Sequence, residues 1–332
     1  MAVTSAPERE RNGALAAGAR LWASFARRPE SGAVLSLLVV GAFLSIFTTQ
    51  FLTVGNLTLV ARGFAFTAIA AMGAFLVILT GGIDLSVGSV MGLAGLTAAV
   101  LSATGTNPLV AILAGLLAGT AVGAINGVLT ATMALAPFMV TLGMLSVVRG
   151  IDVAITGGTP IQGIDPVITW LGQGYVLGIP VPVWIMAIIG LLLTFVMTRT
   201  SFGWHVYSIG GNEEAARLSG VKVRRVKIAV YTVAGLLAAV GGILLTARLG
   251  VGESTSGTGY ELDVIAAAVI GGTSLTGGRG SVVGAIWGAA LLGVVRNGLV
   301  LLGVSDFWQT IAIGLVIIFA VVIDRIRTRN AP

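Results

Sequence analysis

Long apolar runs separated by short polar breaks occupy nearly the whole chain, and they limit its fold more than any other feature. Many approach the ~20 residues that an α-helix needs to cross a bilayer, and few show the strict alternation of a membrane β-strand. They predict an all-α membrane protein with about ten transmembrane helices. The runs lie near residues 33–52, 57–80, 87–104, 107–134, 138–156, 181–198, 228–248, 260–272, 281–303 and 308–323.

The composition excludes a water-soluble globular domain and most metal or thiol chemistry. Charged residues make up 10% of the chain, against about 25% in soluble proteins, and 56% of the residues are hydrophobic. The chain has no Cys, and His205 is its only His. Disulfides and thiolate sites are therefore excluded, and a metal centre is not expected.

The net charge of +6 does not indicate nucleic-acid binding, because most of the 19 Lys and Arg residues gather in three clusters beside apolar runs. The positive-inside rule assigns such clusters to the cytoplasmic side. We therefore expect a basic cytoplasmic segment at 1–32, a membrane domain at 33–323 and a cytoplasmic tail at 324–332. Within the domain we expect a cytoplasmic loop at 199–227 and a periplasmic loop at 157–180. The clusters comprise Arg9, Arg11, Arg20, Arg27 and Arg28; Arg199, Arg217, Lys222, Arg224, Arg225 and Lys227; and Arg325, Arg327 and Arg329.

Two glycine-rich segments share one pattern. Residues 81–88 and 271–278 both read Gly-Gly-x-x-Leu-Ser/Thr-x-Gly, and each follows one apolar run and precedes another. One interpretation is a pair of glycine-broken half-helices at corresponding positions of a duplicated transporter. The other is glycine that lets helices pack closely. The run at 260–272 is too short to cross alone, which agrees with a half-helix.

The polar loop at 199–227 predicts a short helix. Asn212 is a suitable N-cap, the acidic Glu213 and Glu214 suit the positive helix N-terminus, and Gly220 is a suitable terminator. Residues 213–219 then form two turns with a small apolar face. This helix is shaped to dock in a groove of another protein; the alternative is a solvated loop that only sets the topology.

Four motifs carry a resemblance to a known family. They are Gly81–Gly88, Pro137–Met144, Gly210–Gly220 and Gly271–Ser281, the last followed by Asn297 and Gly298. The chain resembles the inner-membrane permease subunits of bacterial ABC importers for monosaccharides such as ribose, xylose, arabinose and galactose. The motifs extend over residues 81–298, which is most of the membrane domain.

The resemblance implies an ATP-driven, binding-protein-dependent importer that works by alternating access. Its partners are a cytoplasmic ABC ATPase, a periplasmic sugar-binding protein, a second permease copy and membrane lipid. No cofactor is expected on this chain, since ATP and Mg²⁺ belong to the ATPase; its two lysines, Lys222 and Lys227, are in no Walker A motif. The coupling helix that docks on the ATPase is expected at Gly210, Asn212, Glu213, Glu214, Ala215, Ala216, Arg217, Leu218, Ser219 and Gly220.

Two alternatives to a sugar importer stay open. A permease of the same superfamily for nucleosides or branched-chain amino acids differs only in its substrate. An ion-coupled secondary transporter, with Asp84 or Glu261 as the ion site, belongs to another class. The lack of a row of carboxylates within the apolar runs disfavours the second.

Seven residues are candidates for the translocation path, and each also has a structural interpretation. Asp84 is favoured as a lock within the glycine-broken segment rather than a substrate ligand. The hydroxyl and amide side chains pair across helices in the structural interpretation, and Trp287 packs in the core. Trp170 and Tyr175 mark loop 157–180 as either an interfacial connector or a docking surface. The seven are Asp84, Ser86, Asn126, Thr141, Thr273, Trp287 and Asn297.

Overall fold

The computed structural model describes residues 30–133 and 135–329, without the side chains of Asp306 and some residues after Val316. Nearly all of the basic segment predicted at 1–32, and the end of the predicted tail at 324–332, lie outside the described residues. Apart from one two-stranded hairpin, the regular structure is helical, which confirms the predicted all-α fold.

Ten helices correspond to the ten apolar runs, with ends shifted by a few residues. They are α2 (Ser31–Phe47), α3 (Val54–Leu79), α4 (Val87–Ala103), α5 (Pro108–Thr132), α6 (Pro137–Thr156), α8 (Val181–Arg199), α11 (Val223–Leu249), α12 (Tyr260–Ile270), α13 (Val282–Leu301) and α14 (Asp306–Arg329). Between them lie α7 (Pro166–Gln173), β1 (Tyr175–Val176), β2 (Ile179–Pro180), α9 (Ser201–Gly211) and α10 (Glu213–Leu218).

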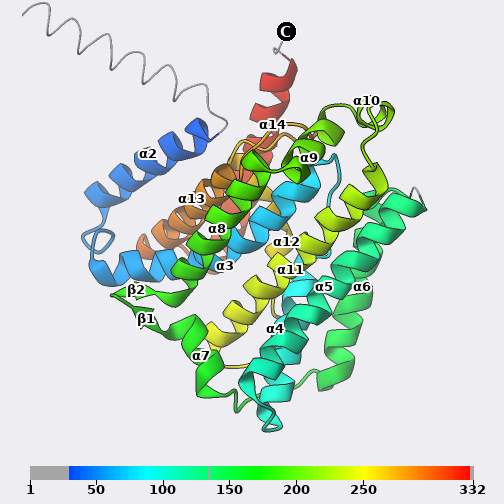
Figure 1. Cartoon of the computed structure of the whole chain (residues 1–332). Helices are drawn as coiled ribbons and strands as arrows, with labels where there is room; N and C mark the ends of the chain where they lie inside the picture. The colour runs from blue at the N-terminus through cyan, green and yellow to red at the C-terminus, as the bar shows by residue number, and fades with distance from the viewer. Residues whose placement is uncertain (1–29, 134, 330–332) are drawn as a thin grey trace, which may run out of the picture.

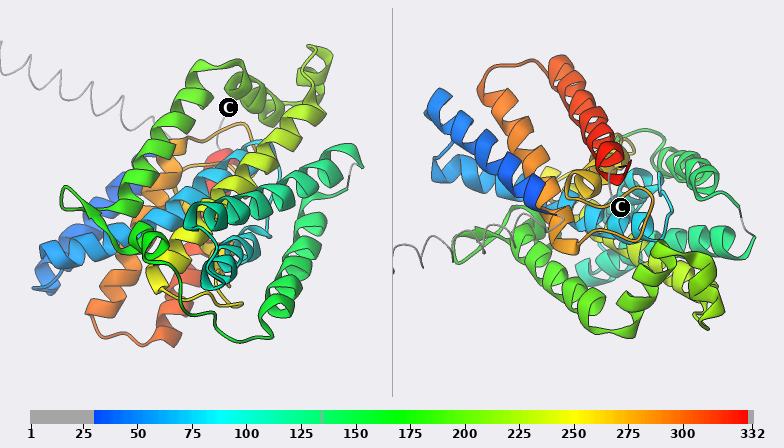
Figure 2. Two further views of the ribbon diagram at one scale, coloured as in Figure 1. Left: turned by 60° about the horizontal axis from the view of Figure 1, so that its bottom comes forward. Right: turned by 90° about the horizontal axis from the view of Figure 1, so that it is seen from above.

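The bundle has two distinct ends (Figure 1). α9 and α10 lie at one end, here called the α10 end, and α7 and the β1–β2 hairpin lie at the other, the hairpin end. The C-terminal end of α14 points toward the α10 end. Viewed from the α10 end, α2, α13 and α14 lie on one side of the bundle, and α5 and α6 lie across from them (Figure 2).

Not all of the ten helices are equally able to cross a bilayer. Among the described residues, six helices are long and apolar enough: α3, α5, α6, α8, α11 and α13. α2 and α4 have 17 residues each, and α12 has only 11. At 1.5 Å per residue α12 is ~17 Å long, so it covers about half of a ~30 Å hydrocarbon layer. The count of about ten spans is compatible with this set of helices.

The core forms around α3 and α11. Every residue of α3 from Ala65 to Leu79 is buried, and α11 is buried along most of its length. α11 packs against α3, α4 and α5, and α3 also contacts α8, α12 and α13. A helix that is apolar all round is expected at the centre of a bundle, so α3 and α11 hold the fold together.

Close helix packing in this core depends on glycine. On α5, a Cβ at Gly123 would collide with the backbone oxygen of Tyr231, and on α11 a Cβ at Gly235 would collide with the backbone oxygen of Gly119. Backbones this close are typical of small-residue contacts between membrane helices. The packing interpretation of glycine therefore applies between α5 and α11.

We expect Gly123→Ala to destabilise the protein by about 1–3 kcal/mol, because the added methyl group forces α5 away from α11. Gly55→Ala near the start of α3 is the control, since nothing lies within 4 Å of that Cβ position. It should be neutral, or stabilising by about 0.5–1 kcal/mol from helix propensity. Thermal unfolding of the purified variants in detergent measures both, and equal melting temperatures would contradict the packing argument.

Candidate functional site

The polar segment between α8 and α11 folds into two short helices. Asn212 caps α10 as predicted, since its Oδ1 accepts a hydrogen bond of 2.9 Å from the amide of Ala215. Gly220 has a φ of 87°, the left-handed conformation expected after a helix end. α10 ends at Leu218 rather than Ser219. Neither α9 nor the start of α11 at Val223, before the apolar run at 228–248, was predicted from the sequence.

The charges of α10 are paired, whereas its apolar tip is exposed. Arg217 bonds Glu214 at 2.6 Å, and Lys227 bonds Glu213 at 2.6 Å. The hydrogen bond that Arg217 donates to the Glu214 carboxylate raises the pKa of Arg217 above its ordinary value. Leu218 is 80% exposed. A single exposed leucine is common on a protein surface, so the docking of α10 on another protein stays a prediction.

α9 joins α10 to both glycine-rich segments. Gly210 lies against the backbone carbonyl of Leu79 and the backbone of Gly278, so that a Cβ at residue 210 would collide with both. The amide of Gly278 donates to the same Leu79 carbonyl at 3.0 Å. Tyr207 donates to the carbonyl of Gly280 at 2.9 Å. This contact of Gly210, Leu79 and Gly278, here called the glycine junction, brings together three segments far apart in sequence.

Four of the seven path candidates surround the first glycine-rich segment. Asp84 Oδ1 accepts from the Ser86 amide at 2.8 Å and from the Ser86 hydroxyl at 2.6 Å. The Asn126 amide donates to the Ser86 hydroxyl at 2.9 Å. The Thr141 hydroxyl accepts from the Leu85 amide at 3.1 Å. These bonds tie the segment between α3 and α4 to α5 and α6, which agrees with a structural lock for Asp84.

The other three candidates lie elsewhere. Thr273 is buried beside Gly280 in the second glycine-rich segment. Trp287 is 38% exposed, so it is not packed in the core. Asn297 exchanges two hydrogen bonds with Asn56, at 2.8 and 3.0 Å. The seven residues therefore do not line one common path within this chain, and their role in transport stays a prediction.

A cavity of about 430 Å³ lies beside α10. Its wall includes Glu213 and Arg217 of α10, Lys227 and Tyr231 of α11, and residues of the first glycine-rich segment. The cavity lies between α10 and the end of α5, whose residues Thr130 and Thr132 also line it. Within residues 30–133 and 135–329, no group of His, Cys, Asp or Glu is arranged to hold a metal ion.

Arg149 points into the protein. An arginine near the end of an apolar run commonly extends its side chain toward the membrane surface instead. Arg149 donates to the carbonyls of Ser254 and Ser256 at 2.8 and 2.9 Å and lies 3.7 Å from fully buried Asp152. The charged pair at an i,i+3 spacing was the available sequence signal. The contact ties α6 to the segment between α11 and α12.

Comparisons with known proteins agree with one another. The sequence profile of the family described as branched-chain amino acid transport system / permease component matches residues 56–321. The ribose import permease protein RbsC of Escherichia coli (strain K12) is 45% identical over 300 residues, which cover 89% of this chain and 93% of that protein. RbsC of Bacillus subtilis (strain 168) is 44% identical over 296 residues, 89% and 92% of the two chains. No solved structure matches.

A third relative carries another substrate in its name. The D-allose transport system permease protein AlsC of Escherichia coli (strain K12) is 38% identical over 290 residues, covering 87% of this chain and 89% of that protein. The similarity to each of these proteins extends over almost the whole membrane region. The predicted family resemblance is confirmed, and the chain is a multi-pass membrane protein.

The bonds of Asp84 predict how two substitutions differ. Asp84→Ala removes the acceptor of two Ser86 donors in a buried site and should cost about 1–3 kcal/mol of stability. Asp84→Asn keeps an oxygen at Oδ1, so it should remain close to the native protein. Thermal unfolding in detergent separates the two. If both variants were equally damaged, the carboxylate charge rather than its hydrogen bonding would be what the site requires.

Proposed function

Because the chain belongs to the branched-chain amino acid transport system / permease component family, we propose that it is the membrane-spanning permease subunit of an ATP-driven, binding-protein-dependent importer of a monosaccharide. The observation that carries the proposal is the similarity to permeases named for ribose and allose along nearly the whole chain. The family's printed description keeps an amino-acid substrate as the second candidate.

The α10 end is the cytoplasmic side in this proposal, and α10 is the element that docks on a separate ABC ATPase. The basic residues of segment 199–227 support this orientation. Exposed Leu218 supplies an apolar contact, and the paired charges around it set the orientation of the partner. ATP and Mg²⁺ are bound by the ATPase, and both termini of the permease lie in the cytoplasm.

The glycine junction connects α10, through α9, with the membrane-spanning helices. α9 transmits a displacement of α10 to Leu79 at the end of α3 and to Gly278 before α13, through direct backbone contact. Backbone contacts do not yield as flexible side chains do, so the three segments move together. ATP-driven closure of the ATPase therefore shifts the permease between outward and inward access.

A second permease copy is proposed to pack on α6. α6 is the least buried of the six long helices, with apolar side chains exposed along its length. Gly143 and Gly150 have nothing within 4 Å of their Cβ positions, so another helix has room to approach. The sister copy covers this face, and lipid covers the rest of the apolar surface.

The hairpin end is the proposed periplasmic side, where a sugar-binding protein docks. Leu177 at the tip of the hairpin is 88% exposed and has a φ of 52°, which is uncommon for a residue with a side chain. Trp170 and Tyr175 are also exposed there. This apolar tip is suited to a binding protein, with the interfacial-anchor interpretation as its alternative.

Reconstitution tests the function directly. We expect liposomes that contain this chain, its ATPase and its binding protein to take up labelled ribose, allose or another monosaccharide only when ATP is present. Nucleosides and leucine belong in the same panel, because their uptake would replace the sugar assignment by the family alternative. Uptake by the chain alone under a proton or sodium gradient would contradict an ABC importer altogether.

A matched pair of glycines tests coupling. Gly210→Ala should reduce the sugar imported per ATP hydrolysed by at least tenfold, because the methyl group breaks the contact with Leu79 and Gly278. Gly211→Ala is the control, since nothing lies within 4 Å of its Cβ position. Uptake and ATPase rates are measured on the assembled complex, with assembly checked by gel filtration. Normal coupling in Gly210→Ala would remove the junction from the mechanism.

A further inference from the structure

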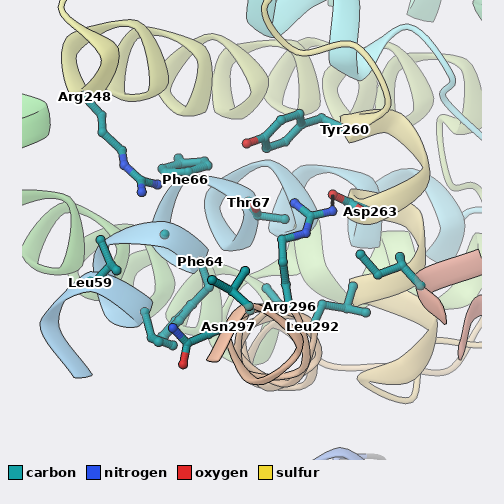
Figure 3. A pocket seen from close by; sticks show the side chains of 16 residues that line it. Leu59, Phe64, Phe66, Thr67, Arg248, Tyr260, Asp263, Leu292, Arg296 and Asn297 are labelled. Atoms are coloured by element: carbon teal, nitrogen blue, oxygen red, sulfur yellow. Dashed lines mark hydrogen bonds and ion pairs between the residues drawn. The ribbon is translucent and has the colours of Figure 1, made fainter. Parts of the chain in front are cut away.

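A second cavity, of about 170 Å³, lies toward the hairpin end of the bundle, and α10 lies at the other end. α3, α11, α12 and α13 enclose it (Figure 3). This volume is small beside the roughly 300–1,000 Å³ of pockets for drug-sized ligands, so the cavity suits a single-ring solute. The residues that carry the chemistry are Phe66, Thr67, Arg248, Tyr260, Asp263 and Arg296.

The wall offers both donors and acceptors. Arg296 bonds Asp263 at 2.9 Å across the helices α13 and α12. The Arg248 guanidinium lies over the Phe66 ring, 5.5 Å from its centroid. The side chains of Arg248, Tyr260 and Thr67 form no hydrogen bond or ion pair with another residue that the structure describes. Their bonding capacity is therefore available to a ligand.

The wall also offers aromatic surface. The rings of Phe66 and Tyr260 lie 6.0 Å apart between centroids, tilted by 45°. Figure 3 shows polar groups on two sides of the cavity, with Arg248 on one side and Tyr260, Asp263 and Arg296 together on the other. A lipid headgroup would need polar groups at one end of the cavity only. Polar groups distributed around an aromatic wall match a solute that carries hydroxyls on every side.

We propose that this cavity is a monosaccharide-binding site of the permease, the first one that a sugar enters from the hairpin end. This inference rests on the proposed function. Sugar hydroxyls accept from Arg248 and donate to Asp263, whose geometry the ion pair with Arg296 holds, and the apolar face of the sugar ring lies against Tyr260. A guanidinium can donate two parallel hydrogen bonds, and a carboxylate can accept two. Two neighbouring hydroxyls of a sugar ring can occupy such a pair of bonds.

The site should bind sugar weakly. Arg296 remains 47% exposed, so at this group bound sugar competes with water. A weak site suits a permease that receives sugar from a binding protein and must release it onward. Selectivity among sugars then depends on the fit of the cavity as well as on the binding protein.

Gly63 of α3 allows a side chain to be added to the cavity wall without replacing any of its polar residues. A Cβ at this position would meet only Arg248 Nη1, at 3.7 Å, which is ordinary contact. Gly55 on the same helix has nothing within 4 Å and does not line the cavity. Gly63→Val therefore adds bulk beside Arg248, and Gly55→Val adds the same bulk away from the site.

The experiment measures sugar contact and transport separately. Saturation-transfer NMR with ribose or allose on the permease in nanodiscs should show a signal for wild type and Gly55→Val, and a loss for Gly63→Val and Arg248→Gln. In the reconstituted complex, the last two variants should import at least tenfold less sugar per ATP, with ATPase stimulation by the binding protein unchanged. Arg199→Gln, at the far end of α8, controls for the loss of one positive charge.

The outcomes separate this site from the proposed function. A wild-type complex that imports no sugar refutes the function and the site together. A wild-type complex that imports sugar, with Gly63→Val and Arg248→Gln equal to it in both measurements, refutes the site alone. If Gly63→Val instead removes a co-purified phospholipid and keeps the sugar signal, the cavity is a lipid site and the proposal is wrong.

Discussion

Backbone groups that leave helical bonding inside an apolar bundle must find other partners, and the architecture of this protein depends on how its two glycine-rich segments find them. The carbonyl of Leu79, at the end of α3 just before the first segment, accepts a hydrogen bond from the amide of Gly278 in the second segment. The amides of Leu85 and Ser86 bond the side chains of Thr141 and Asp84. Specific hydrogen bonds thus hold these segments, although most of their residues are not helical.

Hydropathy was sufficient to predict the ten helices that correspond to the apolar runs, because a bilayer requires each span to be apolar along its own length. α10 was also predictable, since capping is local: Asn212 bonds an amide only three residues away. The hairpin was not predictable, because its two strands have only two residues each and leave no periodic pattern. Where a polar side chain finds a distant partner depends on tertiary structure, so neither the bonds of Arg149 to Ser254 and Ser256 nor the Asn56–Asn297 pair was predictable.

Glycine shows the same limit in another form. The chain has 48 glycines, and the sequence does not distinguish a hinge from a packing contact or a spare position. Gly210 and Gly211 are neighbours, yet one lies against two backbones and the other faces open space. The two interpretations offered for the glycine-rich segments are not exclusive either. Gly278 has a φ of 73° in the non-helical stretch between α12 and α13, and it also allows close approach to α9.

In the proposed mechanism, the long helices connect the sugar cavity with the α10 end. α3 is 26 residues long, or ~39 Å, and runs from the proposed sugar cavity at Gly63 and Thr67 to the glycine junction at Leu79. α12 and α13 also line the cavity and flank the second glycine-rich segment, and α11 connects Arg248 with the segment that follows α10. Every helix around the cavity therefore has its other end near α10. Because these helices are closely packed and stiff, a shift of α10 reaches the cavity wall as a movement of whole helices, with no relay of side chains required.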